Sequence, residues 1–257
     1  MNVHPTAIID PAAEIGVDAT IGPYCVVGPA VVLGEGCWLQ NHVTICGPTK
    51  IGARNRFYAY CSIGQQSQDL KYTGEPTYLE IGDENVFREF VTVSRATGVG
   101  NVTRIGNQGN FLAYSHIAHD CDVRDRVIFS NNGTLGGHVI VEEYAVLGGL
   151  TAVHQFCRIG KHAITGGCTK VVQDVPPFML VDGNPAEVRG VNLVGLERRG
   201  FTADTIRALK EAYRILYRAK LNTKQALEEL VKGGLAETPE VNELMQFIEL
   251  SQRGIVR

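Results

Sequence analysis

The sequence predicts a mainly β protein, in which a parallel β-helix of six-residue repeats is followed by a C-terminal α-helical domain. Three observations support this fold class. An apolar residue recurs every six positions from Val3 to Val171, at 26 of 29 positions, although only 44% of the chain is hydrophobic. Glycine often follows this residue, and a small side chain often stands two places before it. The repeat then stops, and helical spacing replaces it from Phe201.

The six-residue period fits neither the 3.6-residue turn of an α-helix nor the simple alternation of a long strand. It fits short strands joined by tight corners, where one aliphatic side chain per strand points inward and glycine relieves the turn. Three repeats form one triangular coil of about 18 residues. Neighbouring coils lie about 4.8 Å apart. We therefore expect residues one coil apart in sequence to stand above one another.

Two segments interrupt the repeat. In residues 65–80 (QQSQDLKYTGEPTYLE), Asp69 and Glu75 fall on core positions, and the Gly-Glu-Pro run disfavours a strand. We therefore expect residues 65–80 to project from the coil as a loop. Long loops on rigid scaffolds often carry function. Residues 97–101 (TGVGN) predict a smaller excursion.

The coil is expected to span residues 1–184, and the α-helical domain residues 185–257. The apolar face of a first helix is formed by Ile206, Leu209, Tyr213, Leu216 and Tyr217. A second helix is expected to start near Asn222, and a third opens with a capping Thr238 before Pro239. These helices would cover the open end of the coil, where strand edges would otherwise stay unpaired.

Composition argues against several classes of protein. A formal net charge of −3, with no basic run, argues against nucleic-acid binding. The opening residues MNVHPTAIID do not resemble a signal peptide, and no apolar stretch is long enough to span a membrane. We therefore expect no stable membrane insertion. Seven cysteines without a CxxC pair favour reduced thiols and a cytoplasmic location.

Four of the seven histidines cluster in one part of the repeat region: His116, His119, His138 and His154. The intervals from His119 to His138 and from His138 to His154 are each close to one coil, so these three are expected near one edge of adjacent coils. Three explanations are open at this point. The histidines could stack at corners, bind Zn²⁺ as in gamma-type carbonic anhydrases, or act in acid–base catalysis with Asp120 as partner. Spacing alone does not choose between them.

Several motifs, taken together, resemble one family. They are SHIAHDC, SQDLKYTGEPT, GGLTAVHQFCRIG, VQDVPPF, GNPA and GVNLVGLERRGF. In order and spacing they are similar to UDP-N-acetylglucosamine O-acyltransferases over essentially the whole chain. The resemblance implies a left-handed parallel β-helix of hexapeptide repeats, and a homotrimer with active sites at the subunit interfaces. It also implies transfer of a (3-hydroxy)acyl chain from acyl carrier protein to the 3-position of UDP-N-acetylglucosamine in lipid A biosynthesis, with no metal or other cofactor.

The resemblance implies roles for individual residues. His119 matches the general base, Asp120 the carboxylate that supports it, and Gly137 a backbone donor to the oxyanion. Gly167 matches a position whose bulk limits acyl-chain length, and Pro185 is a further candidate for that role. The positions matched to UDP-sugar binding are Gln68, Asp69, Lys71, His116, His138, His154, Gln155, Asn192, Arg198 and Arg199.

Two departures from the family pattern leave alternatives open. Residues 94–97 read Ser-Arg-Ala-Thr where many members have His-Arg-Gly-Thr, and Val194 stands where a glutamate can contact the nucleotide. A 2,3-diamino sugar acylated on nitrogen is therefore an alternative acceptor. A metal-binding hydratase of the carbonic-anhydrase type is a second alternative, and a purely structural or interaction solenoid is a third. Neither of these two accounts for the loop at 65–80.

Overall fold

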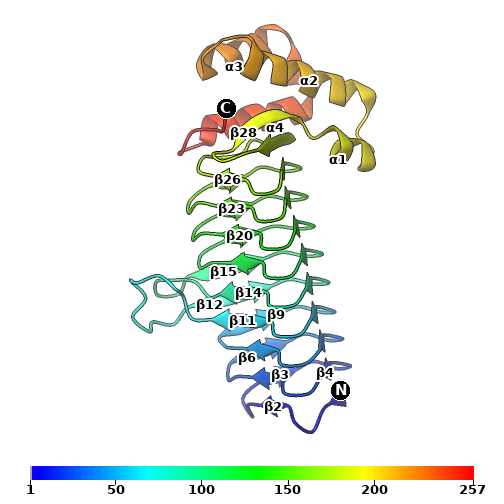
Figure 1. Cartoon of the computed structure of the whole chain (residues 1–257), viewed down its shortest axis with the longest axis vertical. Helices are drawn as coiled ribbons and strands as arrows, with labels where there is room; N and C mark the ends of the chain where they lie inside the picture. Colours follow the sequence, from blue (N-terminus) through cyan, green and yellow to red (C-terminus); the bar gives the residue numbers. More distant parts are fainter. Residues whose placement is uncertain (1) are drawn as a thin grey trace.

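The structure, a computed structural model, describes residues 2–257. Short strands wind upward in a tall coil, and helices lie across its upper end (Figure 1). The strands form three sheets, called sheets A, B and C here. Up to β26, successive strands visit A, B and C in turn, so the coil has an A–B edge, a B–C edge and a C–A edge.

Sheet A contains β1 (Asn2–Val3), β4 (Thr20–Ile21), β7 (Trp38–Leu39), β10 (Arg56–Phe57), β13 (Val86–Phe87), β16 (Asn110–Phe111), β19 (Ile128–Phe129), β22 (Val146–Leu147), β25 (Ile164–Thr165), β27 (Met179–Asp182) and β28 (Glu187–Val191). Sheet B contains β2 (Ile8–Ile9), β5 (Val26–Val27), β8 (Thr44–Ile45), β11 (Ser62–Gln65), β14 (Thr92–Ser94), β17 (His116–Ile117), β20 (Thr134–Leu135), β23 (Ala152–Val153) and β26 (Lys170–Val171). Sheet C contains β3 (Glu14–Ile15), β6 (Val31–Leu33), β9 (Thr49–Ile51), β12 (Tyr78–Ile81), β15 (Val102–Ile105), β18 (Asp122–Val123), β21 (Ile140–Val141) and β24 (Arg158–Ile159).

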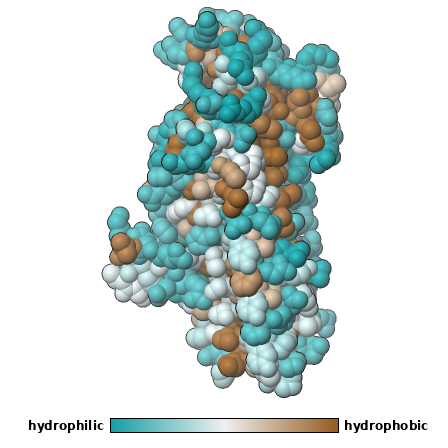
Figure 2. Space-filling view, viewed as in Figure 1, coloured by the Kyte–Doolittle hydropathy of each residue, from teal (hydrophilic) through white to brown (hydrophobic). Residues whose placement is uncertain are grey.

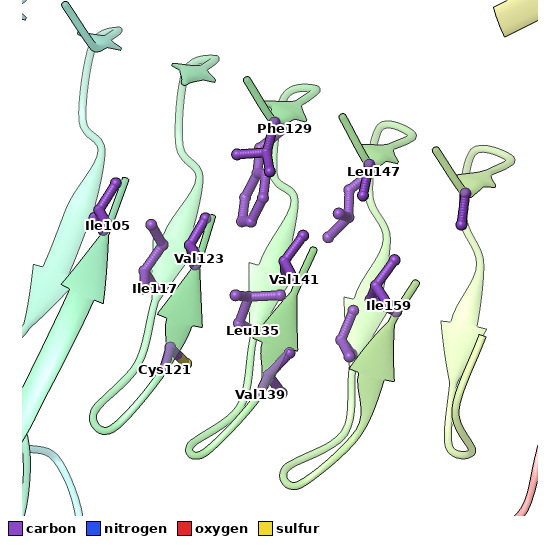
Figure 3. Packing of buried hydrophobic residues seen from close by; sticks show 14 of the residues in the cluster. Ile105, Ile117, Cys121, Val123, Phe129, Leu135, Val139, Val141, Leu147 and Ile159 are labelled. Carbon is purple, nitrogen blue, oxygen red and sulfur yellow. The ribbon is translucent and has the colours of Figure 1, made fainter. Parts of the chain in front are cut away.

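The six-residue frame is confirmed in the interior of the coil. Strands of consecutive coils pair in parallel, as Ile117 does with Leu135, and these aliphatic side chains turn inward (Figure 3). Phe57, Phe87 and Phe111 form a stacked column, with neighbouring ring centroids 4.9 and 4.8 Å apart. A single coil cannot bury its own apolar side chains, so stacking of coils supplies the stabilising core.

The corners turn at residues whose backbone lies in the left-handed region. Asp120 has a φ of 59°, His138 of 60° and Phe156 of 65°. This region costs energy for residues that carry a side chain. Stacking of corner side chains between coils offsets part of that cost, as where Tyr60 stacks on Phe90 with centroids 4.9 Å apart. Every corner therefore holds its side chains at a defined height and direction.

Both predicted interruptions are confirmed as loops, and both leave the coil at the B–C edge. The longer one, residues 66–77, connects β11 of sheet B to β12 of sheet C and projects sideways from the coil (Figure 1). The shorter one, residues 95–101, connects β14 to β15 at the same edge, one coil further on.

The sheet structure continues beyond the predicted boundary between residues 184 and 185. Strands β27 and β28 form an antiparallel hairpin that closes sheet A, so the coil ends at Val191. The helical elements that follow are α1 (Leu193–Arg198), α2 (Ala203–Arg218), α3 (Thr223–Lys232), the 3₁₀ turn η1 (Leu235–Glu237) and α4 (Pro239–Leu250). Asn222 caps α3 through a capping box with Gln225. Thr238 stands at the start of α4 as predicted, but its side chain makes no capping hydrogen bond there.

Buried polar contacts join the last coils to α4. Asp174, which is 2% exposed, accepts a hydrogen bond of 2.7 Å from the Ser251 hydroxyl. The Arg158 guanidinium pairs with Glu142 at 2.5 Å and lies over the ring of Phe247. Within residues 2–257, no helix is both long enough and apolar enough to cross a membrane.

Candidate active site

The B–C edge of the coil brings together polar side chains from both loops and from two successive corners, and an aromatic ring from a third corner. His119 and Asp120 form the corner between β17 and β18. One coil further on, His138 occupies the corner between β20 and β21, and Phe156 occupies the next. Loop 66–77 leaves the coil at this same edge.

His119 and Asp120 face each other although they are consecutive in the chain. The left-handed backbone at Asp120 turns its carboxylate back toward the preceding ring, and His119 Nδ1 lies 2.8 Å from Asp120 Oδ2. The Asp120 N–H donates to Thr103 Oγ1 at 2.9 Å, which holds the turn. The His119 side chain is 11% exposed and that of Asp120 is 8% exposed. A proton on Nδ1 is held by the carboxylate, so Nε2 carries the free lone pair.

The shorter loop holds the Asp120 carboxylate from its other side. The Thr97 N–H donates to Asp120 Oδ2 at 2.9 Å, and Asn101 Nδ2 lies 3.3 Å from Oδ1. These donors stabilise the ionised carboxylate and fix its orientation.

The longer loop in turn supports the shorter one. The hydroxyls of Ser67 and Thr97 are 2.5 Å apart, and Glu75 accepts a hydrogen bond of 2.9 Å from the Gly98 N–H. Backbone hydrogen bonds, that from the Thr73 N–H first, lower the pKa of Glu75 to about 2. Glu75 therefore stays ionised and keeps both loops tied together at neutral pH.

The predicted histidine ladder lies at the B–C edge, but its contacts differ from the prediction. The His138 ring meets that of His119 edge-on at 5.3 Å, and its Nε2 lies 3.9 Å from Asp120 Oδ2. The ring stacked on the other side of His138 is Phe156, at 4.5 Å, and not His154. Phe156 lies one coil, 18 residues, after His138 in the sequence. This interval could have predicted the stacking, but only histidines were considered at this edge.

The two remaining histidines make separate contacts. His154 is exposed, and its Nδ1 lies 3.0 Å from the carbonyl oxygen of Gln155. His116 projects from the outer face of sheet B, and its Nδ1 lies 2.7 Å from Thr92 Oγ1. Burial, and then the nearby His119, lower the pKa of His116. His116 is therefore held neutral, as a ring that can donate or accept a hydrogen bond near His119.

Gly137 is required by the position of the His119 ring. A Cβ at this position would lie 2.4 Å from His119 Cε1 and 2.6 Å from Nε2, so a side chain would displace the ring. In the described part of the chain, no hydrogen bond is donated by the Gly137 N–H. A free backbone donor next to the lone pair of Nε2 is the arrangement that an acyl-transfer oxyanion needs.

The loop residues singled out from the sequence lie apart from the dyad. Gln68 and Lys71 are exposed, and Asp69 uses Oδ1 to accept a hydrogen bond of 2.9 Å from the Lys71 N–H. Across residues 2–257, none of the three bonds to His119 or Asp120. The contacts of Thr97 and Asn101 with the Asp120 carboxylate were not predicted from the sequence. Nothing in TGVGN marks the Thr97 N–H or the Asn101 side chain as a donor to Asp120.

Of the residues predicted to bind the nucleotide, Gln155 lies at the B–C edge, whereas Asn192, Arg198 and Arg199 follow the end of the coil and lie apart from the dyad. Arg199 places its guanidinium 4.1 Å from the ring centroid of Tyr144, a corner residue of the C–A edge. Asn192 is 7% exposed and is occupied by capping α1 and donating to the His162 carbonyl. Arg198 is exposed on the same short helix.

The two positions matched to acyl length are also separated from each other. Gly167 is exposed at the A–B edge, in the corner between β25 and β26. Pro185 is exposed in the turn between β27 and β28. In one protomer, the residues predicted to form the active site therefore lie at all three edges of the coil: His119 at the B–C edge, Gly167 at the A–B edge and Arg199 near the C–A edge.

The hexapeptide coil with a buried histidine–carboxylate pair and a free backbone donor defines a hexapeptide-repeat acyltransferase. A family model described as UDP-N-acetylglucosamine O-acyltransferase, domain 2, matches residues 174–256. The structure of LpxA from Acinetobacter baumannii is 41% identical, covers 100% of both chains and has a TM-score of 0.95. The UDP-N-acetylglucosamine O-acyltransferase (LpxA) of Moraxella catarrhalis is 45% identical, also over 100% of both chains, with a TM-score of 0.94.

A third structure, LpxA of Bacteroides fragilis, described as a UDP-N-acetylglucosamine acyltransferase, is 34% identical over 99% of this chain and 100% of its own, with a TM-score of 0.97. The chain belongs to the UDP-N-acetylglucosamine O-acyltransferase family. Its coil matches the left-handed β-helix of the family, so the predicted fold class and family are confirmed. The carbonic-anhydrase and purely structural alternatives are not favoured.

Proposed function

We propose that this protein transfers a (3-hydroxy)acyl chain from an acyl carrier protein to the 3-hydroxyl of UDP-N-acetylglucosamine, in lipid A biosynthesis. Membership of the family supports the reaction and both substrates. The observation that carries the mechanism is the 2.8 Å contact between His119 Nδ1 and Asp120 Oδ2, which leaves Nε2 as a supported base.

The proposed reaction proceeds in two steps. His119 Nε2 takes the proton of the sugar hydroxyl while that oxygen attacks the thioester carbonyl, and Asp120 stabilises the imidazolium that forms. The negative charge then rests on the former carbonyl oxygen, where the Gly137 N–H can donate a hydrogen bond. The intermediate collapses by breaking the carbon–sulfur bond, and the proton on Nε2 passes to the leaving thiolate. We propose that neither a metal nor another cofactor takes part, because His119 transfers the proton and the Gly137 N–H stabilises the oxyanion. Acyl carrier protein is a co-substrate and not a cofactor.

A hydroxyl acceptor is favoured over the 3-amino analogue. The departures from the family pattern that raised the amine are Ser94, Ala96 and the exposed Val194. Ser94 is 3% exposed and Ala96 is fully buried. Membership of the UDP-N-acetylglucosamine O-acyltransferase family, and not the burial of these two side chains, supports the hydroxyl acceptor.

The acyl chain is proposed to lie along the outer face of sheet B. This face separates the B–C edge, which carries His119, from the A–B edge, which carries Gly167. Between them, Thr134 and Ala152 present small side chains on successive strands. A Cβ at Gly167 would meet only the Gly149 carbonyl oxygen, at 3.5 Å, so there is open space at this end of the path.

The complete site is proposed to form between subunits of a homotrimer. Arg199 and His119 occupy different edges of one protomer, so packing a second copy edge to edge would bring the two groups toward one substrate. The A–B edge also carries exposed aromatic rings that a subunit contact would bury, Tyr60 at 47%, Phe90 at 41% and Tyr114 at 55% exposure. Exposed apolar side chains of this kind mark protein–protein contacts.

The projecting loop supports the same assembly. Leu70 is fully exposed, and Figure 2 shows hydrophobic colouring at the outer end of this loop. A neighbouring subunit would cover this side chain and would bring Gln68, Asp69 and Lys71 to a shared cleft. We further propose a cytoplasmic location, where the cysteines stay reduced, and no nucleic-acid partner.

Product analysis tests the proposed function. The purified protein is incubated with a series of acyl carrier proteins and with either UDP-N-acetylglucosamine or its 3-amino analogue, and the products are separated by mass and by base stability. We expect a base-labile ester on UDP-N-acetylglucosamine. Faster formation of a base-stable amide on the amino sugar would overturn the acceptor assignment, and no acyl transfer to either sugar would overturn the function.

A further inference from the structure

The dyad and His138 bring three metal-ligating atoms together at the B–C edge. One ring nitrogen of His119, one carboxylate oxygen of Asp120 and one ring nitrogen of His138 all lie within 4.8 Å of one another, and the contacts at Asp120 point to His119 Nδ1, Asp120 Oδ2 and His138 Nε2. The carboxylate oxygen is 2.8 Å from the first nitrogen and 3.9 Å from the second. In a tetrahedral Zn²⁺ site with bonds of about 2.0–2.2 Å, ligand atoms lie about 3.3–3.6 Å apart. Shifts of about half an ångström would bring the two distances to the carboxylate oxygen into that range, and the two nitrogens would approach each other by at most about 1.2 Å.

The three ligands are held in place by their surroundings. His119 lies against Gly137, and His138 is sandwiched between His119 and Phe156. The Asp120 carboxylate keeps a hydrogen bond from the Thr97 N–H at 2.9 Å, the kind of support that orients metal-bound carboxylates. A ligand set that needs little reorganisation binds a metal more tightly, because less conformational entropy is lost on binding.

The chemistry of the set selects the kind of metal. Two imidazoles and one carboxylate are ligands that Zn²⁺ takes while keeping a fourth position for water, whereas Mg²⁺ and Ca²⁺ prefer oxygen ligands. The His138 side chain is 37% exposed, so the set is reachable from solvent. Two neutral imidazoles with one carboxylate carry a charge of about −1, which favours a divalent cation.

We propose that His119, Asp120 and His138 bind Zn²⁺, and that the bound metal inhibits acyl transfer. Zn²⁺ binds Nδ1 of the neutral His119 ring, whose proton moves to Nε2 by exchange with solvent, and it also binds the Asp120 oxygen that supported the ring. Because Nε2 then carries the proton, it has no lone pair with which to accept the proton of the sugar hydroxyl. This metal is an inhibitor and not a cofactor. The inhibitory effect rests on the proposed function, whereas the metal site itself does not.

Zinc titration of the full-length, chelator-treated protein by calorimetry tests the site without any substrate. Cys168, an exposed thiol, is first changed to serine so that it cannot bind zinc. We expect one Zn²⁺ per chain, and a loss of affinity of at least about tenfold in both His138→Phe and Asp120→Asn. Phenylalanine suits this corner, since Phe90 and Phe156 occupy equivalent corners with φ of 60° and 65°.

The matched control is His116→Asn, which changes a neighbouring histidine outside the ligand set and is expected to bind zinc as the parent protein does. Equal zinc affinity in the parent and in both ligand variants would overturn the site, as would no binding by the parent. In the acyl-transfer assay, zinc is expected to lower the rate, and a chelator to restore it. Zinc binding with an unchanged rate would overturn the inhibition. A protein that binds zinc through these residues but transfers no acyl chain would contradict the proposed function and leave the metal site intact.

Discussion

His119 and Asp120 are consecutive residues whose side chains meet, with Nδ1 2.8 Å from Oδ2. In an extended strand their side chains would point to opposite faces. The corner reverses this, because Asp120 adopts a φ of 59°. The coil therefore pairs an imidazole with a carboxylate from two adjacent positions, and we propose that they act as a base and its supporting group.

Asp120→Asn is expected to lower turnover while the coil stays folded. The amide keeps the size of the side chain, but the charge-assisted hydrogen bond to His119 is lost, and such bonds contribute about 1.5–3 kcal/mol. The corresponding loss in kcat is about 10- to 150-fold. Steady-state kinetics at saturating substrates, with a thermal melt to verify folding, measures this effect. A variant with wild-type kcat would show that the carboxylate does not support the base.

Gly137→Ala is expected to reduce kcat strongly, because its Cβ would lie 2.4 Å from His119 Cε1 and move the ring. Gly149 occupies the same position of the six-residue repeat. A Cβ there would meet only the Asn131 carbonyl oxygen, at 3.6 Å, so Gly149→Ala is the matched control. With a short-chain acyl donor, the control should retain activity and the Gly137 variant should not. Equal losses in the two variants would point to a general disturbance of the coil.

Mixed assemblies test whether the site lies between subunits. His119→Ala and Arg199→Ala are each expected to be poorly active alone. When both chains are co-expressed and assemble together, some sites pair an intact His119 with an intact Arg199 from the neighbouring chain, and activity should return. If both residues serve a site within one chain, every site in the mixture carries a defect. No recovery of activity in verified mixed trimers would therefore contradict the proposal.

His162 is expected to make the fold sensitive to acid. It is 5% exposed, and its Nδ1 has no hydrogen-bond partner among residues 2–257. Burial, followed by the charges of Arg199 and Lys161, lowers its pKa from 6.5 to about 4. Between pH 6.5 and 4 the unfolded chain binds more protons at this residue than the folded one, so stability should fall as the pH falls. The loss amounts to roughly 3 kcal/mol at the acid end of this window.

Thermal melts across this pH range compare the wild type with His162→Phe. The aromatic ring should keep the stacking on Tyr144, whose centroid is 4.8 Å away, and it has no group that titrates. The variant should melt with a shallower pH dependence than the wild type. Parallel curves for the two proteins would assign the acid sensitivity to other residues.

Most of the fold can be predicted from the sequence because the repeat encodes it directly. Each inward aliphatic residue, such as Ile117 or Leu135, marks one short strand of the coil. The loops at 66–77 and 95–101 can be recognised because they interrupt this pattern. The end of the coil was placed too early, because β28 (Glu187–Val191) pairs in an antiparallel hairpin that does not follow the six-residue frame.

The site was less predictable than the coil. Periodicity placed His119 and His138 at one edge, but the left-handed backbone that turns Asp120 toward His119 has no signature in the residue type. The support from the Thr97 N–H is a backbone contact, which depends on how two loops pack and not on side-chain identity. The choice of His119 as the base came from the family motif, and its geometry agrees with that choice.

The central claim is that His119 is the general base of acyl transfer to UDP-N-acetylglucosamine. The most direct measurement is kcat for His119→Gln at saturating acyl carrier protein and sugar nucleotide, with His116→Asn measured alongside and folding verified by thermal melting. We expect a loss of about 10²–10⁴-fold for His119→Gln, and a smaller loss for His116→Asn. A folded His119→Gln protein with turnover close to that of the wild type would contradict it.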